Sequence, residues 1–180
     1  MRTAVLVITL FAALAAVVAV ARAEVKTLPR GSFSFEVEVT LPGTQEEIFD
    51  AATGDISGWW DHTFSGKPKA FYLEPKAGGA FMEIFDDQGN GVRHAAVIYC
   101  DRPRMIRFEG PLGFSGNAIL MVHTYEFTAV GPDYTKLTLK AQGVGHVEDG
   151  WPAVIENVWK HLLIERFKPY VEEGKHKGKK

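Results

Sequence analysis

The chain has 180 residues, with 20 Lys and Arg against 22 Asp and Glu and a single cysteine. One cysteine excludes an internal disulfide, and the slightly acidic balance argues against a nucleic-acid-binding surface. The length fits one ordinary domain that buries a sizeable core without cross-links.

The N-terminus has the pattern of a secretory signal peptide. Arg2 precedes an apolar run over residues 4–21, and Ala21-Arg22-Ala23 supplies a small-x-small cleavage sequence. The run is short for a membrane span, which takes about 20 apolar residues. We therefore expect removal of residues 1–23 by cleavage after Ala23, with an uncleaved anchor as the alternative. The remaining chain would be secreted or periplasmic, with no integral membrane span, and its net charge would be −4 because Arg2 and Arg22 are lost.

After a predicted linker over residues 24–31, the first elements are a strand and two short helices. Residues 33–41 alternate apolar and polar side chains, as in a strand with one buried face. Thr44 and Glu47 have the spacing of a capping box, which predicts a helix over residues 44–53. Asp55 then begins a second short helical turn, DISGWW.

The rest of the chain predicts antiparallel hairpins and then one long helix. The strand-like runs are residues 70–75, 80–86, 92–101, 105–109, 119–130 and 135–145. Over residues 149–173 apolar side chains recur every three or four positions, which indicates an amphipathic helix with Pro152 in its first turn. Residues 174–180 are basic, and we expect a disordered tail. The predicted fold class is α+β, with a curved antiparallel sheet of six to seven strands wrapped around the C-terminal helix.

Several motifs resemble those of the SRPBCC (START-like, helix-grip) superfamily. PGTQEEIFDAATGDISGWW, EPKAGGAFMEI, GVRHAAVIYCDRPRMIRFEG and TKLTLKAQG are similar to motifs of its branch of heat-shock-protein ATPase activator homologues, and the resemblance covers residues 32–173. It implies a cavity between sheet and helix, in which members bind lipids, sterols, polyketides or hormones and some catalyse cyclisation, hydration or hydrolysis. The chain departs from that branch at Val158-Trp159, where the branch has Gly-Trp, and in its signal sequence, which argues against a co-chaperone role.

Alternation along the strands suggests which side chains face such a cavity. Four sets each share one face: Phe81, Glu83 and Phe85; His94, Ala96, Ile98 and Cys100; Ile106 and Phe108; Met121, His123, Tyr125 and Phe127. Glu83, His94 and His123 are the candidate acid or base groups if the protein is an enzyme. The residues that we expect to contact a ligand are Trp60, Phe81, Glu83, His94, Phe108, Phe114, Met121, His123, Tyr125, Trp151, Ile155 and Trp159.

The segment GDISGWWDHTFSG places two tryptophans beside an Asp-His pair. Trp59 and Trp60 point about 100° apart on one helical turn. We therefore expect Trp59 to pack in the core and Trp60 to line the cavity wall. We interpret Asp61-His62 as exposed or capping, with catalysis as the alternative. We interpret the loop GPLGFSG as a gate of the cavity, with Phe114 as the gating side chain. We expect Cys100 to be a buried, inert thiol.

Other site types lack their motifs. The six histidines form no H-x-x-x-H or H-E-x-x-H spacing, no G-x-S-x-G elbow is present, and no glycine loop leads to Gly-Lys-Ser/Thr. We therefore expect neither a metal nor a cofactor.

Three functions remain, with the oligomeric state open. The first is an extracytoplasmic protein that binds a small hydrophobic or lipid-like ligand in the cavity. The alternatives are a cavity enzyme of polyketide cyclase or hydratase type, and a protein-binding module without a ligand.

Overall fold

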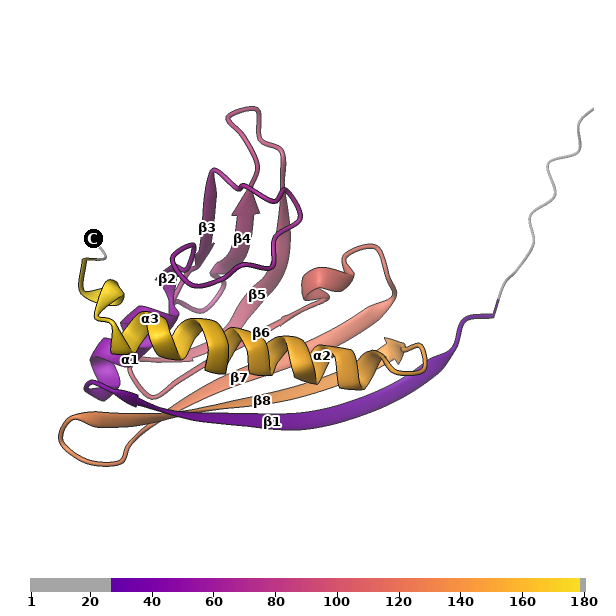
Figure 1. Cartoon of the computed structure of the whole chain (residues 1–180). Helices are drawn as coiled ribbons and strands as arrows, with labels where there is room; N and C mark the ends of the chain where they lie inside the picture. Colours follow the sequence, from indigo (N-terminus) through magenta and orange to yellow (C-terminus); the bar gives the residue numbers. More distant parts are fainter. Residues whose placement is uncertain (1–26, 179–180) are drawn as a thin grey trace, which may run out of the picture.

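The computed structural model describes residues 27–178, so the predicted signal peptide lies outside the described residues. Its strands form one antiparallel sheet in the order β1-β8-β7-β6-β5-β4-β3-β2, so that only β1 and β8 are neighbours without being consecutive in the chain (Figure 1). The bounds are β1 Arg30–Pro42, β2 Gly54–Asp55, β3 Ala70–Leu73, β4 Ala80–Ile84, β5 Gly91–Asp101, β6 Met105–Gly110, β7 Ile119–Ala129 and β8 Tyr134–His146. The predicted α+β fold with a long C-terminal helix is confirmed.

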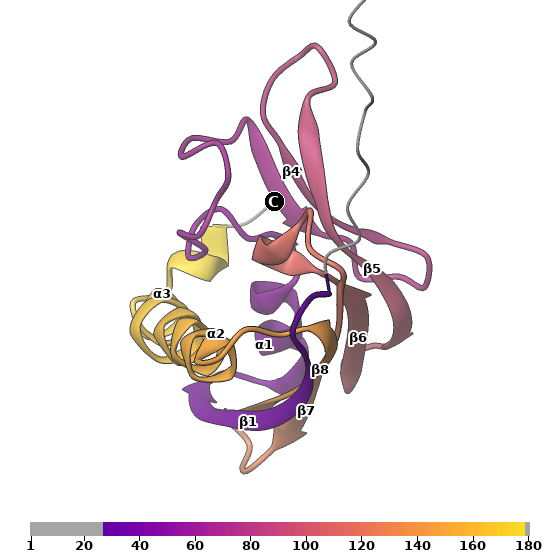
Figure 2. The same ribbon diagram turned by 90° about the vertical axis from the view of Figure 1, so that its right-hand side faces the viewer.

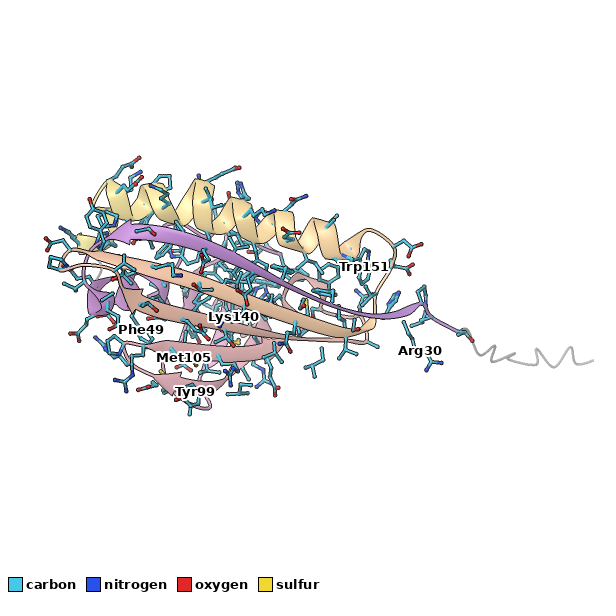
Figure 3. The ribbon with its side chains drawn as sticks, turned by 90° about the horizontal axis from the view of Figure 1, so that it is seen from below. Arg30, Phe49, Tyr99, Met105, Lys140 and Trp151 are labelled. Atoms are coloured by element: carbon cyan, nitrogen blue, oxygen red, sulfur yellow. The ribbon has the colours of Figure 1, made fainter. Side chains whose placement is uncertain are left out.

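The sheet is curved, and the C-terminal helix lies on its concave side (Figure 2). The long β1–β8 pairing runs from Arg30 opposite His146 to Pro42 opposite Tyr134. Alternation along β1 buries Val37, Val39 and Leu41 on the inner face, as the sequence pattern predicts. The outer face of the sheet, with Tyr99, Met105 and Lys140 labelled, is seen in Figure 3.

The C-terminal helix consists of three segments, α2 Trp151–Lys160, the π-helical η2 His161–Phe167 and α3 Lys168–Glu172. Pro152 lies in the first turn of α2, as predicted. Trp151 lies where the helix begins, at the end of the sheet that also carries Arg30 (Figure 3). The π-helical turns were not predicted, because the apolar spacing that they produce differs little from that of an α-helix over seven residues.

The segment after β1 contains one helix where the sequence predicts two. Thr44 caps α1 Gln45–Ala52, and its predicted capping box with Glu47 is present. The second predicted helix is only a turn, in which the Trp59 and Trp60 amides both donate to the Ile56 carbonyl. The preceding Gly54–Asp55 pairs with β3 as β2, which adds an eighth strand.

The described part of the basic tail contacts the end of the C-terminal helix. Lys175–Gly178 form the 3-10 helix η3, and the His176 ring lies 6.3 Å from that of Tyr170. This contact with the end of α3 gives the tail a packing surface that its composition does not indicate.

Aromatic side chains fill the middle of the space between sheet and helix. Phe81 lies edge-on to Phe108, and Phe108 edge-on to Tyr125, with ring centroids 5.8 and 5.4 Å apart. Such edge-to-face pairs are favourable beyond the area that they bury. Within residues 27–178, no helix is both long and apolar enough to cross a membrane.

Candidate functional site

A cavity of about 310 Å³ remains at the end of the core beneath α2. Its walls come from the loop after Trp60, from β5 and β7, from the 3-10 helix η1 Leu112–Phe114, and from α2 and η2. Figure 2 shows that η1 and the C-terminal helix lie on the same, concave side of the sheet. The lining residues are Trp60, His62, Thr63, Phe64, His94, Leu112, Gly113, Phe114, Met121, Val154, Ile155, Val158, Trp159 and Leu162.

The cavity is apolar, with few polar groups. Among the described residues, the lining side chains with a nitrogen or oxygen atom are those of His62, Thr63 and His94 and the Trp60 and Trp159 indoles. Ligand sites typically combine an apolar wall with a few convergent polar groups, in volumes of about 300–1,000 Å³. The volume here is at the low end of that range, which suits a ligand of one or two rings or a short acyl chain.

The structure separates the predicted ligand contacts into two groups. Those that line the cavity are Trp60, His94, Phe114, Met121, Ile155 and Trp159. Those that do not line it are Phe81, Glu83, Phe108, His123 and Tyr125, which are fully buried, and Trp151, which packs on the Phe114 ring at 4.6 Å. Strand alternation correctly predicts that the five buried residues face the core. It does not distinguish the filled middle of the core from the end that contains the cavity.

The lining residues that sequence reasoning missed come mostly from loops and from the helix. They are His62, Thr63, Phe64, Leu112, Gly113, Val154, Val158 and Leu162. The lining residues of the helix lie within the amphipathic segment 149–173. The lining residues outside it belong to segments without a periodic sequence pattern, so no such signal predicts them. Phe64 and Val154 are 50% and 56% exposed, so apolar side chains also border the opening.

Strand β5 departs from the predicted alternation. His94 is buried as expected, but Ala95 and Val97 are buried too, whereas Ile98 is 44% exposed. The register with β4 shifts at Phe81/Met82, and the register with β6 shifts between Val97 and Tyr99. Each shift is a bulge that reverses the side-chain alternation. The prediction that Ala96 and Ile98 share the inner face with His94 is therefore wrong.

The predicted acid-base candidates Glu83 and His94 are in contact. His94 Nε2 lies 3.2 Å from Glu83 Oε2, and both side chains are buried. The pKa of Glu83 lies below its ordinary value, because its hydrogen bonds outweigh the effect of burial, which alone would raise it. Since an ionised carboxylate only accepts hydrogen bonds, Nε2 of His94 is the donor.

Glu83 also holds the loop that forms one cavity wall. Its carboxylate accepts hydrogen bonds from the Phe64 amide at 2.9 Å, the Ser65 amide at 2.9 Å and the Ser65 hydroxyl at 2.7 Å. His94 is the fourth donor to the same group. A single buried carboxylate thus joins the loop at Phe64 and Ser65 to His94, a strand residue that lines the cavity.

Burial lowers the pKa of His94, and its hydrogen bonds to Glu83 and to the Leu112 backbone partly oppose this. The imidazole is therefore neutral near pH 7. Leu112 begins η1 and has a left-handed backbone, with φ of 48°. Such strain at a non-glycine residue is concentrated at sites of function, and Leu112 lines the cavity together with His94.

His123, the third acid-base candidate, has different surroundings. Its ring stacks on Phe108 with centroids 5.3 Å apart and lies 5.0 Å from Trp159. Neither ring nitrogen has a hydrogen-bond partner among the described residues, and burial lowers its pKa to about 3. His123 is therefore separated from the Glu83–His94 pair and from the cavity.

The tryptophan pair occupies the positions expected of it. Trp59 is buried against Phe167, with ring centroids 4.7 Å apart, and Trp60 lies along the cavity. Asp61 and His62 are exposed but engaged, because Asp61 contacts His62, His161 and Arg166. Cys100 is only partly buried; its thiol donates to the Pro75 carbonyl, and burial raises its pKa.

No protein-family model matches the sequence, and no curated protein sequence matches it either. Solved structures do. An HSP90 activator from Plasmodium falciparum is 19% identical over 77% of this chain and 93% of its own, with a TM-score of 0.55. A norcoclaurine synthase point mutant from Thalictrum flavum, in complex with a transition-state analogue, is 11% identical over 83% and 99%, with a TM-score of 0.51. A protein of unknown function from Staphylococcus aureus is 12% identical over 81% and 97%, with a TM-score of 0.62. At these identities the likeness establishes the helix-grip fold.

Proposed function

We propose that this helix-grip protein binds a small hydrophobic ligand in the cavity beneath α2, with a polar atom of the ligand against His94. The observation that carries the proposal is an apolar cavity with one buried, hydrogen-bonded imidazole on its wall. Burying apolar ligand surface contributes about 25 cal/mol per Å². His94 lines the cavity, so a polar atom of a bound ligand can contact its ring.

A titration with naphthol and with decanoate, followed by intrinsic tryptophan fluorescence, tests this proposal. Trp60 and Trp159 line the cavity and would report occupancy. Val158→Phe narrows the cavity, whereas Val144→Phe makes the same change on the exposed surface of β8. We expect Val158→Phe to weaken binding about tenfold or more, which is about 1.4 kcal/mol, and Val144→Phe to leave it unchanged. Equal affinity in both variants, or no binding of either probe, would contradict the proposal.

We further propose that the protein acts outside the cytoplasm. This rests on Arg2, the apolar run over residues 4–21 and the small residues around Ala23. The intact mass of the protein isolated from its source should equal that of Glu24–Lys180. A mass that includes residues 1–23 would support a retained anchor instead.

The Glu83–His94 contact favours acid-base catalysis as the second candidate function. A carboxylate that receives a hydrogen bond from an imidazole orients the ring and stabilises its protonated form, which suits His94 to take a proton from a bound ligand. Incubating the bound ligand with the protein in D₂O, followed by mass spectrometry, would reveal deuterium incorporation or a new product. Incorporation that His94→Gln abolishes supports catalysis, and an unchanged ligand supports binding alone.

A further inference from the structure

Three potential metal ligands meet where the loop after Trp60 reaches the C-terminal helix. Asp61 Oδ1 lies 2.7 Å from His62 Nδ1, and Asp61 Oδ2 lies 2.9 Å from His161 Nε2. One ligand atom from each residue lies within 4.8 Å of the others. The loop and the helix are a hundred residues apart in the chain, so no local spacing motif could reveal the cluster.

We propose that Asp61, His62 and His161 bind a divalent transition-metal ion, with Zn²⁺ as the reference metal. Imidazole nitrogen and carboxylate oxygen are the donors that Zn²⁺ accepts alongside thiolate, at about 2.0–2.2 Å. A tetrahedral ion with such bonds separates its ligand atoms by about 3.3 Å. The two Asp61 contacts are shorter than this and use different carboxylate oxygens, and one ligand atom from each residue lies within 4.8 Å of the others, so the side chains must rotate to admit the ion.

The neighbours of His161 resemble those of a metal-bound histidine. His161 Nδ1 lies 2.8 Å from Glu165 Oε2, which leaves Nε2 directed at Asp61. Histidines that bind metals usually donate their second ring N–H to such a carboxylate, which fixes the ring and raises its basicity. His161 and Glu165 both belong to the π-helical segment η2, and π-helical turns occur frequently at functional sites.

The side chains of the Asp61–His62–His161 cluster are accessible to solvent, and the cluster lies next to the cavity. Asp61 and His62 are exposed, and the His161 side chain is 33% exposed, so an ion can enter from solvent. His62 also lines the cavity, so an ion held by the three residues would lie at its mouth. Three protein ligands leave a coordination position for water or for a donor atom of a ligand.

Arg166 provides a way to distinguish metal binding by the cluster from a simple ion-pair network. Its Nε lies 3.0 Å from Asp61 Oδ2, so the guanidinium competes with a cation for the same oxygen. If Asp61 served only to join the loop to the helix, its ion pair with Arg166 would stabilise that contact and the affinity for metal would be negligible. If the cluster binds metal, removing Arg166 should increase the affinity.

The test is calorimetric titration of Zn²⁺ into the full mature chain, purified without a histidine tag and treated with a chelator. We expect one ion per chain, with His62→Gln and His161→Gln each weakening binding about tenfold or more. His146→Gln is the matched control, because His146 pairs with a carboxylate, Glu148 at 2.7 Å, outside the cluster. Arg166→Gln should tighten binding several-fold, and circular dichroism should show that all variants remain folded.

Three results would overturn the proposal. They are no Zn²⁺ binding, binding that survives both cluster histidine substitutions, and equal weakening by His146→Gln. Co²⁺ provides a second readout that does not depend on stability, since a bound four-coordinate ion gives intense visible absorption bands. These bands should be present in the unsubstituted chain and absent in His161→Gln.

Discussion

Replacing His123 by Phe should stabilise the protein, and more so in acid. The imidazole of His123 is fully buried between Phe108 and Trp159, and neither nitrogen has a partner among the described residues. Burying an unpaired polar group costs about 1–3 kcal/mol. Phe keeps the aromatic stacking and removes both nitrogens, so we expect a gain of about 1 kcal/mol at pH 7 after some cost of fitting the larger ring.

The pH dependence gives the larger effect. Burial lowers the pKa of His123 to about 3, whereas a histidine in the unfolded chain titrates near 6.5. Between these values the unfolded chain binds one more proton than the native state, so stability falls as the pH falls, by about 1.4 kcal/mol per pH unit. From pH 7 to pH 5 the His123 contribution to this loss is about 2 kcal/mol. The stabilisation by His123→Phe should therefore be about 3 kcal/mol at pH 5.

Urea denaturation at several pH values between 7 and 5, followed by tryptophan fluorescence, measures this difference. The free energies of unfolding of the two proteins should diverge as the pH falls, with similar denaturant slopes. Other groups titrate in both proteins, so only the difference between them reports His123. Parallel curves would refute the reasoning, because they would mean that His123 is protonated, or hydrogen-bonded to solvent, inside the native protein.

Two further predictions concern the packing around Glu83 and around Gly110. Glu83→Gln should destabilise the protein by about 2–4 kcal/mol, because the amide cannot accept all four hydrogen bonds. It should also speed tryptic cleavage at Lys69, just after the loop; an unchanged cleavage rate would contradict the anchoring role. Gly110→Ala should prevent folding or lower the melting temperature strongly, since its Cβ would lie 2.3 Å from the His94 carbonyl oxygen. Gly113→Ala, whose Cβ meets no atom within 4 Å, should change stability by less than about 1 kcal/mol; equal effects at both glycines would disprove the packing argument.

The strands and the long helix could be predicted because their signals are local. Alternation along β1 and the capping box at Thr44 each depend on a few adjacent residues, and the structure contains both. The bulges around His94 and Ile98 could not be predicted, since a register shift depends on the partner strand. The alternation pattern therefore placed His94 correctly and Ile98 wrongly.

The site was less predictable than the fold, for the same reason. The sequence indicates Glu83 and His94 as separate candidates, and the pairing of β4 with β5 brings them into contact. The contact of Asp61 with His161 links a loop to a helix far along the chain. Where packing leaves a cavity depends on how large side chains fill the core, and residue order does not specify that.

Native mass spectrometry of the protein purified from its own source tests ligand binding in the cavity without a chosen probe. We expect a stoichiometric small molecule that is released on denaturation, is mainly apolar, and is lost or reduced in Val158→Phe but retained in Val144→Phe. Its mass should suit a cavity of about 310 Å³. A clean unliganded mass in every charge state, or an adduct that both variants retain equally, would contradict ligand binding in the cavity beneath α2.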